Sequence, residues 1–483
     1  MSATAAPLPT RLAFFHGLGS IAYGVKDNGF STFLLLYYNQ VLGMDAKLVG
    51  AALALALILD AFVDPLIGHF SDRTYTRWGR RLPWLYLAPL PLALAWYLMW
   101  ATATPDFWTL VLTAMAVRTL VSCCEVPSVA LVPELTPDYD ERSRLMRFRY
   151  LFGWGGGLLI MILAYTVFLS DGLLQREGYL AYGLAGAVMI AGAVLTSALG
   201  QHSAAAHYPR SRPAPQTIRG ALGEILECFS HPAFVILMMA GALAYTSQGI
   251  TFSISNYLYL FIWQLQDTTF SFGALGTVNA LKFYPVFLFG SVIVTFFTVG
   301  PMHRRWGKRD TAAACAVLGM VFWVVPFALR HFGWWWPVGS LESTLALYAF
   351  VFASNVFSVA AIISAASMVA DVVEASEMET GKRSEGTFFA GNFFMQKCAT
   401  GLGILGTGLL VDLAGMPEKA VPGQVAGEVI DRLALGYSVV VALFAIGIGL
   451  ILRRFPITRA DHEARLAALA AARINPDAEG MHP

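Results

Sequence analysis

The chain has few charged residues. Asp, Glu, Lys and Arg make up only 13% of its 483 positions, while 57% are hydrophobic and the mean hydropathy is +0.60. Soluble domains carry charges at roughly 25% of their positions, so this deficit argues against a soluble protein. It predicts a polytopic protein that lies in a lipid bilayer. We expect such a protein to bind no nucleic acid.

Cysteine is also scarce, and common motifs of catalysis are missing. The five cysteines lie mostly in apolar segments without the spacing of a metal site; they are Cys123, Cys124, Cys228, Cys315 and Cys398. We interpret them as small core residues that neither bind metal nor form disulfides. The sequence has no phosphate-binding loop, nucleophile elbow or His/Cys/Asp cluster. It therefore argues against an enzyme, and we expect no cofactor.

Long apolar runs are what the chain has in abundance. A helix that spans a bilayer needs about 20 mostly apolar residues, and twelve segments reach this length. We therefore predict an all-α membrane protein with twelve transmembrane helices. The predicted spans are 12–42, 48–70, 83–103, 107–133, 149–170, 178–200, 233–264, 272–300, 311–332, 343–370, 387–414 and 433–453.

Arginine and lysine are distributed unevenly between the loops. Every second loop contains a basic cluster, whereas the remaining loops contain only scattered basic residues. The clusters lie at 73–81, 142–147, 210–219, 304–309, 382–383 and 453–454. Because strongly basic loops stay on the cytoplasmic side, we predict that both termini are cytoplasmic and that the protein lies in the bacterial inner membrane.

A sequence repeat divides the chain near its middle. Arg77-Trp78-Gly79-Arg80-Arg81 recurs as Arg305-Trp306-Gly307-Lys308-Arg309. The longest polar stretch inside the chain lies between these copies, at 201–232. The pattern predicts two pseudo-symmetric halves of six helices with a substrate site between them at mid-membrane. The predicted parts are an N-terminal bundle at 1–200, a cytoplasmic linker at 201–232, a C-terminal bundle at 233–455 and a cytoplasmic tail at 456–483.

Two carboxylates lie inside the second predicted span. Asp60 and Asp64 are four residues apart, so they share one face of a helix. Ionisable groups inside a membrane helix are costly and mark a functional site by default. Two carboxylates offer several oxygen ligands to a hard cation such as Na⁺, and a pair of acids can also hold a proton. Pairing with arginines that merely packs the helices is the structural alternative.

The fourth predicted span contains Arg118 and Glu125, which are seven residues apart and share a helix face. Glu125 precedes Val126-Pro127, and a proline inside a membrane helix leaves a carbonyl that can line a cavity. We predict that Glu125 joins the cation site and also contacts the substrate. A structural salt bridge between Arg118 and Glu125 is the alternative.

Three more charged residues lie inside apolar runs. Lys26 and Asp27 are neighbours in the first span, where they form either an internal ion pair or part of the substrate site. Lys397 lies well inside the eleventh span, where a lone ammonium needs an acid or an anionic substrate. We predict that Lys397 faces the substrate cavity.

Together, these residues and their neighbours resemble the glycoside–pentoside–hexuronide:cation symporters, a family of the major facilitator superfamily. The similarity extends over the whole chain and implies the fold of that superfamily. The matching segments are Asp60-Ala-Phe-Val-Asp64-Pro65, Gly68-x-x-x-Asp72-Arg73, Arg77-Trp78-Gly79-Arg80-Arg81-x-Pro83-Trp84, Glu125-Val126-Pro127-x-x-x-Leu131-Val132-Pro133, Glu141-Arg142-x-x-Leu145-x-x-x-Arg149 and Met368-x-x-Asp371-Val372-Val373-Glu374.

The resemblance implies roles for individual residues. Asp60 and Asp64 take the cation-site positions of the family. Other matched positions are the acid of helix 4, the arginine of helix 5 and the lysine of helix 11, here Glu125, Arg149 and Lys397. Two sugar-contacting positions differ: the family's helix 1 acid aligns with Gly24, and its helix 4 tryptophan aligns with Val129. The cation site therefore matches better than the sugar site.

We predict a symporter that couples a cation, Na⁺ rather than H⁺, to a sugar, a glycoside or a related amphiphile by alternating access. The alternatives are a sodium-dependent lysophospholipid transporter and an uncoupled lipid flippase. We expect a monomer with a cytoplasmic gate in which basic loop residues meet carboxylates. The predicted gate residues are Asp72, Arg73, Arg77, Arg80, Arg81, Glu134, Asp138, Glu141 and Asp371, with the basic loop 304–309.

Overall fold

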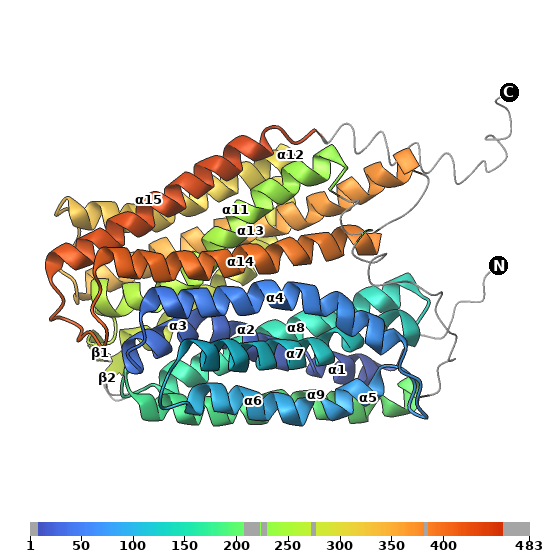
Figure 1. Ribbon diagram of the computed structural model, residues 1–483. Helices are drawn as coiled ribbons and strands as arrows, with labels where there is room; N and C mark the ends of the chain where they lie inside the picture. The colour runs from blue at the N-terminus through green and yellow to red at the C-terminus, as the bar shows by residue number, and fades with distance from the viewer. Residues whose placement is uncertain (1–7, 207–222, 224–228, 272–276, 381–384, 457–483) are drawn as a thin grey trace.

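A computed structural model of the chain describes residues 8–206, 223, 229–271, 277–380 and 385–456. The helices run roughly side by side, with those before residue 206 on one side and those after residue 229 on the other (Figure 1). The helices of the first half are α1 (Thr10–Leu18), α2 (Ile21–Asn28), η1 (Gly29–Phe33), α3 (Leu34–Leu36), η2 (Tyr37–Val41), α4 (Ala46–Asp72), α5 (Leu82–Leu87), α6 (Pro89–Ala101), α7 (Phe107–Leu135), α8 (Tyr139–Leu163), η3 (Ala164–Phe168) and α9 (Arg176–Ala205).

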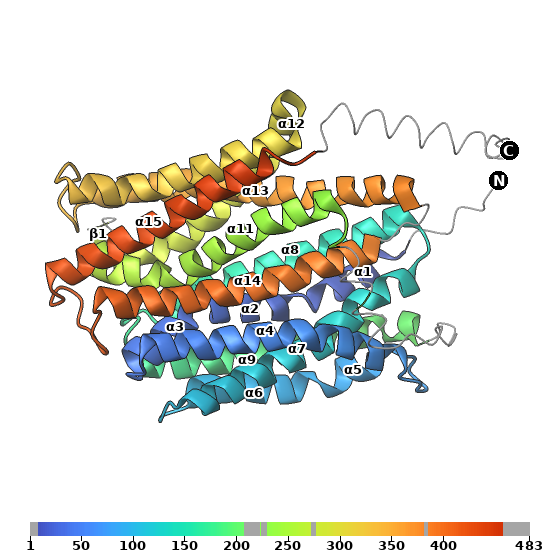
Figure 2. The same ribbon diagram turned by 45° about the horizontal axis from the view of Figure 1, so that its top comes forward.

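The second half contains longer helices and one short hairpin, which Figure 2 shows from another angle. Strands β1 (Thr269–Ser271) and β2 (Thr277–Asn279) pair in antiparallel fashion. The helices are α11 (Pro232–Tyr257), η4 (Leu258–Ile262), η6 (Ala280–Phe283), α12 (Tyr284–His331), α13 (Leu341–Thr380), α14 (Glu385–Ala414) and α15 (Gly427–Leu452).

The described residues account for twelve membrane crossings. Nine helices among them are long and apolar enough to span a bilayer. One of these, Ala280–His331, has 52 residues and leaves the helical conformation at Gly307, where φ is 76° and ψ is 165°; it provides two crossings. Residues 10–41 and 82–101 provide two more from consecutive shorter helices. The predicted fold class is confirmed.

The two copies of the sequence repeat share two local features. Gly79 and Gly307 adopt positive φ angles of 86° and 76°, which glycine tolerates because it has no Cβ. In each copy the preceding arginine lies over the tryptophan ring, at 5.0 Å for Arg77 and 5.9 Å for Arg305. The repeat therefore marks a turn at Gly79 in the first half and a break within α12 at Gly307 in the second.

Several predicted boundaries differ from the structure. The sequence predicts that the eighth span begins at 272, but residues 277–279 form β2, and helical backbone begins only at Ala280. Asn279 ends the strand by accepting a hydrogen bond from the Leu281 N–H at 2.8 Å. The fifth and tenth spans extend past their apolar cores, to Tyr139 and Thr380. Most of the predicted linker and nearly all of the predicted tail lie outside the described residues.

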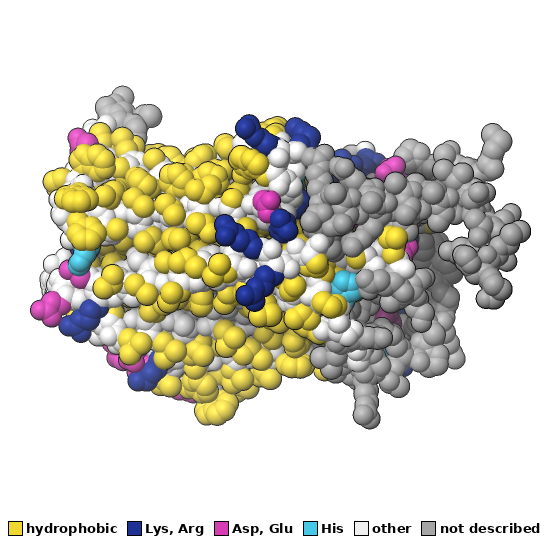
Figure 3. Space-filling view, turned by 90° about the horizontal axis from the view of Figure 1, so that it is seen from above, with side chains coloured by type: hydrophobic (Ala, Val, Ile, Leu, Met, Phe, Trp, Pro, Cys, Tyr) yellow, Lys and Arg dark blue, Asp and Glu magenta, His cyan; other side chains and the backbone are white. Residues whose placement is uncertain are grey.

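The outer surface of the bundle is apolar. Figure 3 shows hydrophobic side chains across a broad face of the second half, flanked by charged side chains. Phe296, Phe297 and Leu413 are among the large side chains that remain largely exposed. Apolar surface of this extent is unfavourable in water and suits the hydrocarbon core of a bilayer.

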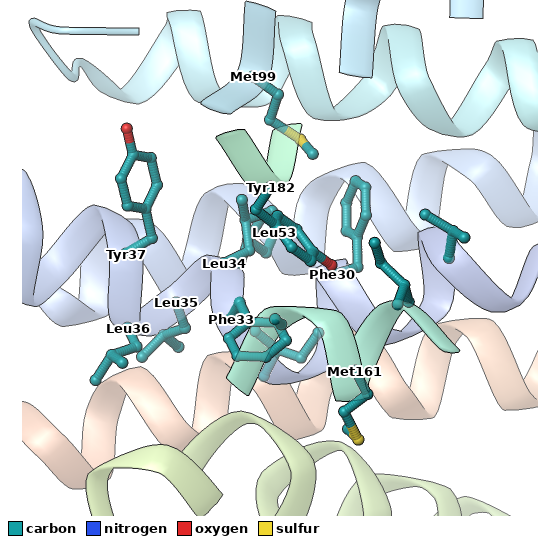
Figure 4. Packing of buried hydrophobic residues seen from close by; sticks show 14 of the residues in the cluster. Phe30, Phe33, Leu34, Leu35, Leu36, Tyr37, Leu53, Met99, Met161 and Tyr182 are labelled. Carbon is teal, nitrogen blue, oxygen red and sulfur yellow. The ribbon is translucent and has the colours of Figure 1, made fainter. Parts of the chain in front are cut away.

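Aromatic side chains fill the core of the first half. Phe33, Met99 and Tyr182 come from three different helices and pack in one buried cluster (Figure 4). Trp100 stacks on Tyr179 with ring centroids 5.7 Å apart. Dense packing of this kind makes the first half a rigid support for the polar groups that face the second half.

Small residues let α4 of the first half approach α14 of the second half closely. A Cβ at Gly408 would lie 2.4 Å from the carbonyl oxygen of Ala46, and one at Gly401 would lie 3.2 Å from that of Ala54. Glycine permits such backbone contact between membrane helices. This contact brings the acidic face of α4 next to α14.

The halves are also joined by hydrogen bonds at the end of the bundle opposite the arginine-rich loops. Asn256 Nδ2 donates to the Thr32 carbonyl at 2.9 Å, and Tyr257 Oη donates to Asn39 Oδ1 at 2.8 Å. Thr32 lies in the π-helical segment η1. Such widened turns interrupt the regular helical hydrogen bonding and are frequent at functional sites.

Gln40 continues this connection. Its Nε2 donates to the Pro417 carbonyl at 3.1 Å, and its Oε1 accepts from the Ala420 N–H at 2.8 Å. We call these contacts, together with those of Asn39, Asn256 and Tyr257, the outer seam. Asn39, Gln40, Asn256 and Tyr257 are all fully or almost fully buried, so the halves are sealed together at this end.

Candidate functional site

Asp60 and Asp64 lie on adjacent turns of α4, where this helix packs between α7 and α14. Asp60 is buried, with only 1% of its surface exposed. The side chain of Asp64 is 31% exposed. As predicted from their spacing, the two carboxylates point to the same side of the helix. They differ, however, in their access to solvent.

Arg118 on α7 pairs with Asp60. Its Nε and Nη2 donate to Asp60 Oδ2 at 2.9 and 2.7 Å. Arg118 is itself only 6% exposed. The structure therefore places Arg118 against Asp60, where the sequence left a pairing with Glu125 open.

Lys397 reaches both carboxylates from the other half of the protein. Its Nζ lies 2.5 Å from Asp64 Oδ2 and 2.8 Å from Asp60 Oδ2. Lys397 stands on α14, which packs directly on α4. Lys397 was predicted to lie inside the bundle, and its ammonium has two acidic partners there.

Ser122 lies between the other two carboxylate oxygens and was not predicted. Its Oγ is 3.1 Å from Asp60 Oδ1 and 2.6 Å from Asp64 Oδ1. A hydroxyl carries a single proton, so it can donate to only one of them at a time. The signal was present in the sequence, because Ser122 follows Arg118 by four residues and shares its helix face.

We call Asp60, Asp64, Arg118, Ser122 and Lys397 the charge cluster. It contains two carboxylates and two basic groups, so its formal charges balance. Buried charges are tolerated when they are paired and hydrogen-bonded, and each of these four groups has an opposite charge within 3 Å. Two carboxylate oxygens and a hydroxyl converge at one side of the cluster, which is a donor set suited to a hard cation.

Within the described residues, no group of three or more His, Cys, Asp or Glu side chains comes together as at a metal site. The oxygen-rich part of the charge cluster therefore differs from the sites of zinc and other transition metals, which use nitrogen or sulfur ligands.

Within the described residues, neither Glu125 nor Arg149 has a hydrogen bond or ion pair with the charge cluster. Arg149 is buried, donates to Ser128 Oγ at 2.6 Å and lies 5.5 Å from the centre of the Tyr23 ring. Glu125 and Arg149 are both within electrostatic reach of the Tyr23 hydroxyl. In the described part of the chain, no hydrogen bond or ion pair links Glu125 to Asp60 or Asp64.

The adjacent pair on α2 forms an internal salt bridge. Lys26 Nζ lies 2.5 Å from Asp27 Oδ1. The side chain of Lys26 is buried, but that of Asp27 is 63% exposed, although it belongs to a membrane helix. Lys26 is within electrostatic reach of Asp60, and Asp27 of Arg118. The pair thus combines a structural contact with an acid whose side chain is largely exposed.

The two positions that depart from the sugar-site pattern have distinct surroundings. A Cβ at Gly24 would lie 2.0 Å from the Gly153 carbonyl oxygen, because α2 and α8 cross there. No side chain fits at this position while the helices are packed as observed. Val129 is exposed and apolar. The acid nearest to Gly24 on α2 is Asp27, about one helical turn away.

At the end of the bundle opposite the outer seam, basic loop residues of the first half form a network. Arg81 donates to Glu134 Oε1 at 3.0 Å and to Ser71 Oγ at 2.7 Å, and it also pairs with Asp72. Arg80 donates to the same Glu134 oxygen at 2.8 Å. This network ties the loop after α4 to the end of α7.

The second half contains a corresponding contact, and the other predicted gate residues have more local partners. Lys308 Nζ lies 2.5 Å from Asp371 Oδ1, which again links a repeat loop to the fourth helix of its half. Glu141 pairs with Arg144 at 3.3 Å on α8. The remaining residues contact neighbours in sequence: Arg73 contacts His69, Arg77 lies over Trp78, and Asp138 accepts from the Glu141 N–H.

Comparisons with known proteins agree with this architecture. The sequence matches the MFS/sugar transport protein family over residues 15–459. An uncharacterized symporter of Synechocystis sp. is 29% identical, and the match covers 96% of each chain. An isoprimeverose transporter of Lactiplantibacillus pentosus is 25% identical, with 84% of this chain and 81% of that protein covered.

Two further matches concern a curated relative and a solved structure. A glucuronide carrier protein homolog of Escherichia coli is 27% identical over 80% of each chain. The inward open xylose transporter XylE from E. coli superposes with a TM-score of 0.61 at 14% identity, covering 95% of this chain and 98% of that one. At this identity the superposition speaks for the fold.

Proposed function

The chain belongs to the MFS/sugar transport protein family, and we propose that it couples the movement of a sugar or glycoside to that of Na⁺. Membership makes it a secondary active symporter of the bacterial inner membrane rather than an enzyme. The proposal concerns what membership leaves open, namely the coupling ion, the substrate and the residues that bind them.

The charge cluster is the observation that carries this proposal. Asp60, Asp64 and Ser122 belong to the first half, and Lys397 belongs to the second. A transporter of this fold alternates between two openings by moving its halves around a central site. Ionic contacts that bridge the halves at that site must rearrange during this movement. Ligands that bind there can therefore control it.

We infer that Na⁺ binds between Asp60 and Asp64, with the Ser122 hydroxyl as a further oxygen ligand. Lys397 then leaves Asp64, because the cation neutralises the carboxylate in its place. Substrate and cation stabilise the same closed arrangement of the halves, so each raises the affinity for the other. A proton on Asp64 is the alternative coupling ion.

The substrate would meet polar groups on both halves. The side chain of Asp27 is largely exposed and can accept hydrogen bonds from sugar hydroxyls. Lys397, once it has left Asp64, can bind a hydroxyl or an anionic group. Glu125, which follows Ser122 by three residues on α7, and the buried Arg149 on α8 complete the set of candidate substrate ligands. Two relatives are named for isoprimeverose and glucuronide, which supports a sugar.

A lysophospholipid is the second candidate substrate. Two features favour it: Gly24 has no room for an acid, and the exposed Val129 presents an apolar surface where a sugar site would have an aromatic ring. A site with fewer polar groups binds an amphiphile more readily than a polyhydroxylated sugar. Sodium coupling would be retained in this case, whereas an uncoupled flippase would not need two buried carboxylates.

Thermal unfolding of the purified protein tests these proposals. A ligand that binds only the folded state raises the melting temperature, and the rise grows with the ratio of ligand concentration to Kd. Sugars, glycosides and lysophospholipids would each be added in NaCl and in choline chloride at equal ionic strength. We expect a sugar or glycoside to stabilise the protein only in Na⁺. Stabilisation that ignores Na⁺, or that occurs only with lysophospholipid, would contradict the corresponding part of the proposal.

Matched variants give this screen a control. Asp60→Asn and Asp64→Asn should remove the effect of Na⁺, because each takes away a carboxylate charge at the cation site. Asp171→Asn changes an exposed acid in a loop far along the chain and should behave like the wild type. Loss of the Na⁺ effect in Asp171→Asn would show that the readout follows general stability instead.

A further inference from the structure

We propose that Arg118 is a fixed countercharge that limits the cation site to a single net negative charge, so that one monovalent cation binds per transport cycle. The proposal rests on the function proposed above and assigns a positioning role to a residue outside the cation-binding carboxylates. Arg118 would act through Asp60, whereas Lys397 would be the group that the cation displaces.

The contact between Arg118 and Asp60 has the character of a permanent pair. Two guanidinium nitrogens converge on one oxygen, at 2.9 and 2.7 Å. Both residues are almost completely buried. They stand on α4 and α7, which pack against each other within the first half. A movement of the halves relative to each other leaves such a contact intact, and separating it would leave two unpaired charges in the bilayer.

Lys397 has the opposite properties. Its side chain is 21% exposed, it is long and flexible, and it belongs to the second half. Its partner Asp64 is also the more exposed carboxylate. An ammonium is a compact charge that needs no fixed geometry, so an incoming cation can take its place without rearranging the first half.

The sum of the charges then gives the number of monovalent cations that the site can hold. With Lys397 in place, the charge cluster is neutral. When Lys397 leaves, Asp60, Asp64 and Arg118 together carry one negative charge, which a single monovalent cation neutralises. Lys26 and Asp27 pair with each other and together add no net charge, and within the described residues no hydrogen bond or ion pair joins Glu125 to Asp60 or Asp64. Without Arg118 the same site would carry two negative charges.

Binding of ²²Na⁺ to the purified full-length protein tests this inference without a substrate. The variants are Asp60→Asn, Arg118→Gln and the double variant Asp60→Asn/Arg118→Gln. The control is Asp431→Asn/Arg330→Gln, which removes an exposed Arg–Asp pair with a 3.2 Å contact elsewhere in the protein. Size-exclusion chromatography confirms that each variant is folded. If Asp60→Asn does not fold, Arg118→Gln and the double variant carry the test.

We expect the wild type and the control to bind one Na⁺ with a Hill coefficient of one. Asp60→Asn should lose binding, because Arg118 then faces the site without a partner. The double variant should regain one Na⁺, since its site again carries one negative charge and the introduced amide still offers an oxygen. Arg118→Gln should bind Na⁺ at least about tenfold more tightly, or bind a second ion, because a nearby positive charge has been removed.

The results separate the two proposals. A wild type that binds no Na⁺ would contradict sodium coupling itself, and the role of Arg118 in it. A wild type that binds Na⁺, with a folded double variant that does not, would overturn only the role of Arg118. Unchanged affinity and stoichiometry in Arg118→Gln would overturn it as well. A merely structural arginine would affect folding without changing the number of ions bound.

Discussion

Lys397 lies 2.5 Å from Asp64 although 333 residues separate them in the sequence. The contact joins α14 of the second half to α4 of the first half. It therefore links the movement of the halves to the charge state of a carboxylate. Lys397 and three residues at other contacts in the structure can each be substituted to test the roles inferred for them.

Lys397→Ala should tighten Na⁺ binding and weaken substrate uptake. The cation no longer competes with an ammonium for Asp64, and the substrate loses a cationic ligand. Uptake by cells or proteoliposomes and Na⁺ titration of the purified protein measure the two effects separately. Lys282→Ala provides a control in another helix. If Lys397→Ala transports and binds Na⁺ like the wild type, the residue has a structural role only.

Gly24→Ala should destabilise the first half. The new Cβ would lie 2.0 Å from the Gly153 carbonyl oxygen, so α2 and α8 must move apart; overpacking of this kind typically costs about 1–3 kcal/mol. The melting temperature in detergent measures the effect. Gly155→Ala on α8 is the matched control, because a Cβ added there would meet nothing within 4 Å. Equal melting temperatures for the two variants would contradict the tight crossing.

Tyr257→Phe should weaken the outer seam. The change removes the hydroxyl that donates to Asn39 Oδ1 at 2.8 Å and leaves this buried amide oxygen with Gln40 Nε2 as its donor, at a cost of about 0.5–1.5 kcal/mol for the lost hydrogen bond. The population should shift toward the arrangement in which this end is open. Distances between spin labels on the two halves report the shift. An unchanged distance distribution would show that the seam does not hold the conformation.

Glu134→Gln should loosen the loop after α4. Arg80 and the buried Arg81 both donate to Glu134, so Arg80 loses this opposite charge and Arg81 keeps only Asp72. We expect a lower melting temperature and faster proteolysis of the loop. Glu141→Gln is the control, because Glu141 makes one longer contact, at 3.3 Å, with Arg144 of its own helix. A larger effect at Glu141 than at Glu134 would contradict the importance of this network.

Helix number and the acidic pair could be predicted from the sequence because each depends on local pattern. A span needs only a run of apolar residues, and an i, i+4 spacing places Asp60 and Asp64 on one face whatever surrounds them. The repeat likewise indicated corresponding positions in the two halves, where Gly79 and Gly307 both adopt positive φ angles. Their expected orientation relative to the cytoplasm remains a prediction.

The partners of these groups could not be predicted with the same ease. Arg118 and Ser122 lie opposite Asp60 and Asp64 because of how α4 and α7 are aligned. Successive turns of one helix pack beside successive turns of the other. Glu125 is seven residues beyond Arg118, about 10 Å along α7. It therefore lies beyond the level of Asp60 and Asp64. This alignment depends on contacts between helices, which no spacing within a single helix reveals.

The hydrogen bonds of the outer seam could not be predicted from the sequence for a different reason. Asn39, Gln40 and Asn256 are polar amides in apolar runs, and such residues are often found at helix ends facing water. Here they are buried because the halves close over them. Their hydrogen bonds use carbonyls in π-helical and loop segments, and a regular helical pattern does not predict those segments.

Sodium-driven uptake by Asp64→Asn tests the proposed cation site most directly. Proteoliposomes with an inward Na⁺ gradient would be supplied with a sugar or glycoside found in the thermal screen, with potassium replacing sodium as the reference. We expect the wild type to accumulate substrate only with the Na⁺ gradient, and the folded Asp64→Asn variant to lose this accumulation. Undiminished Na⁺-driven accumulation by the variant would contradict the assignment of Asp64 as the carboxylate that exchanges Lys397 for the coupling ion.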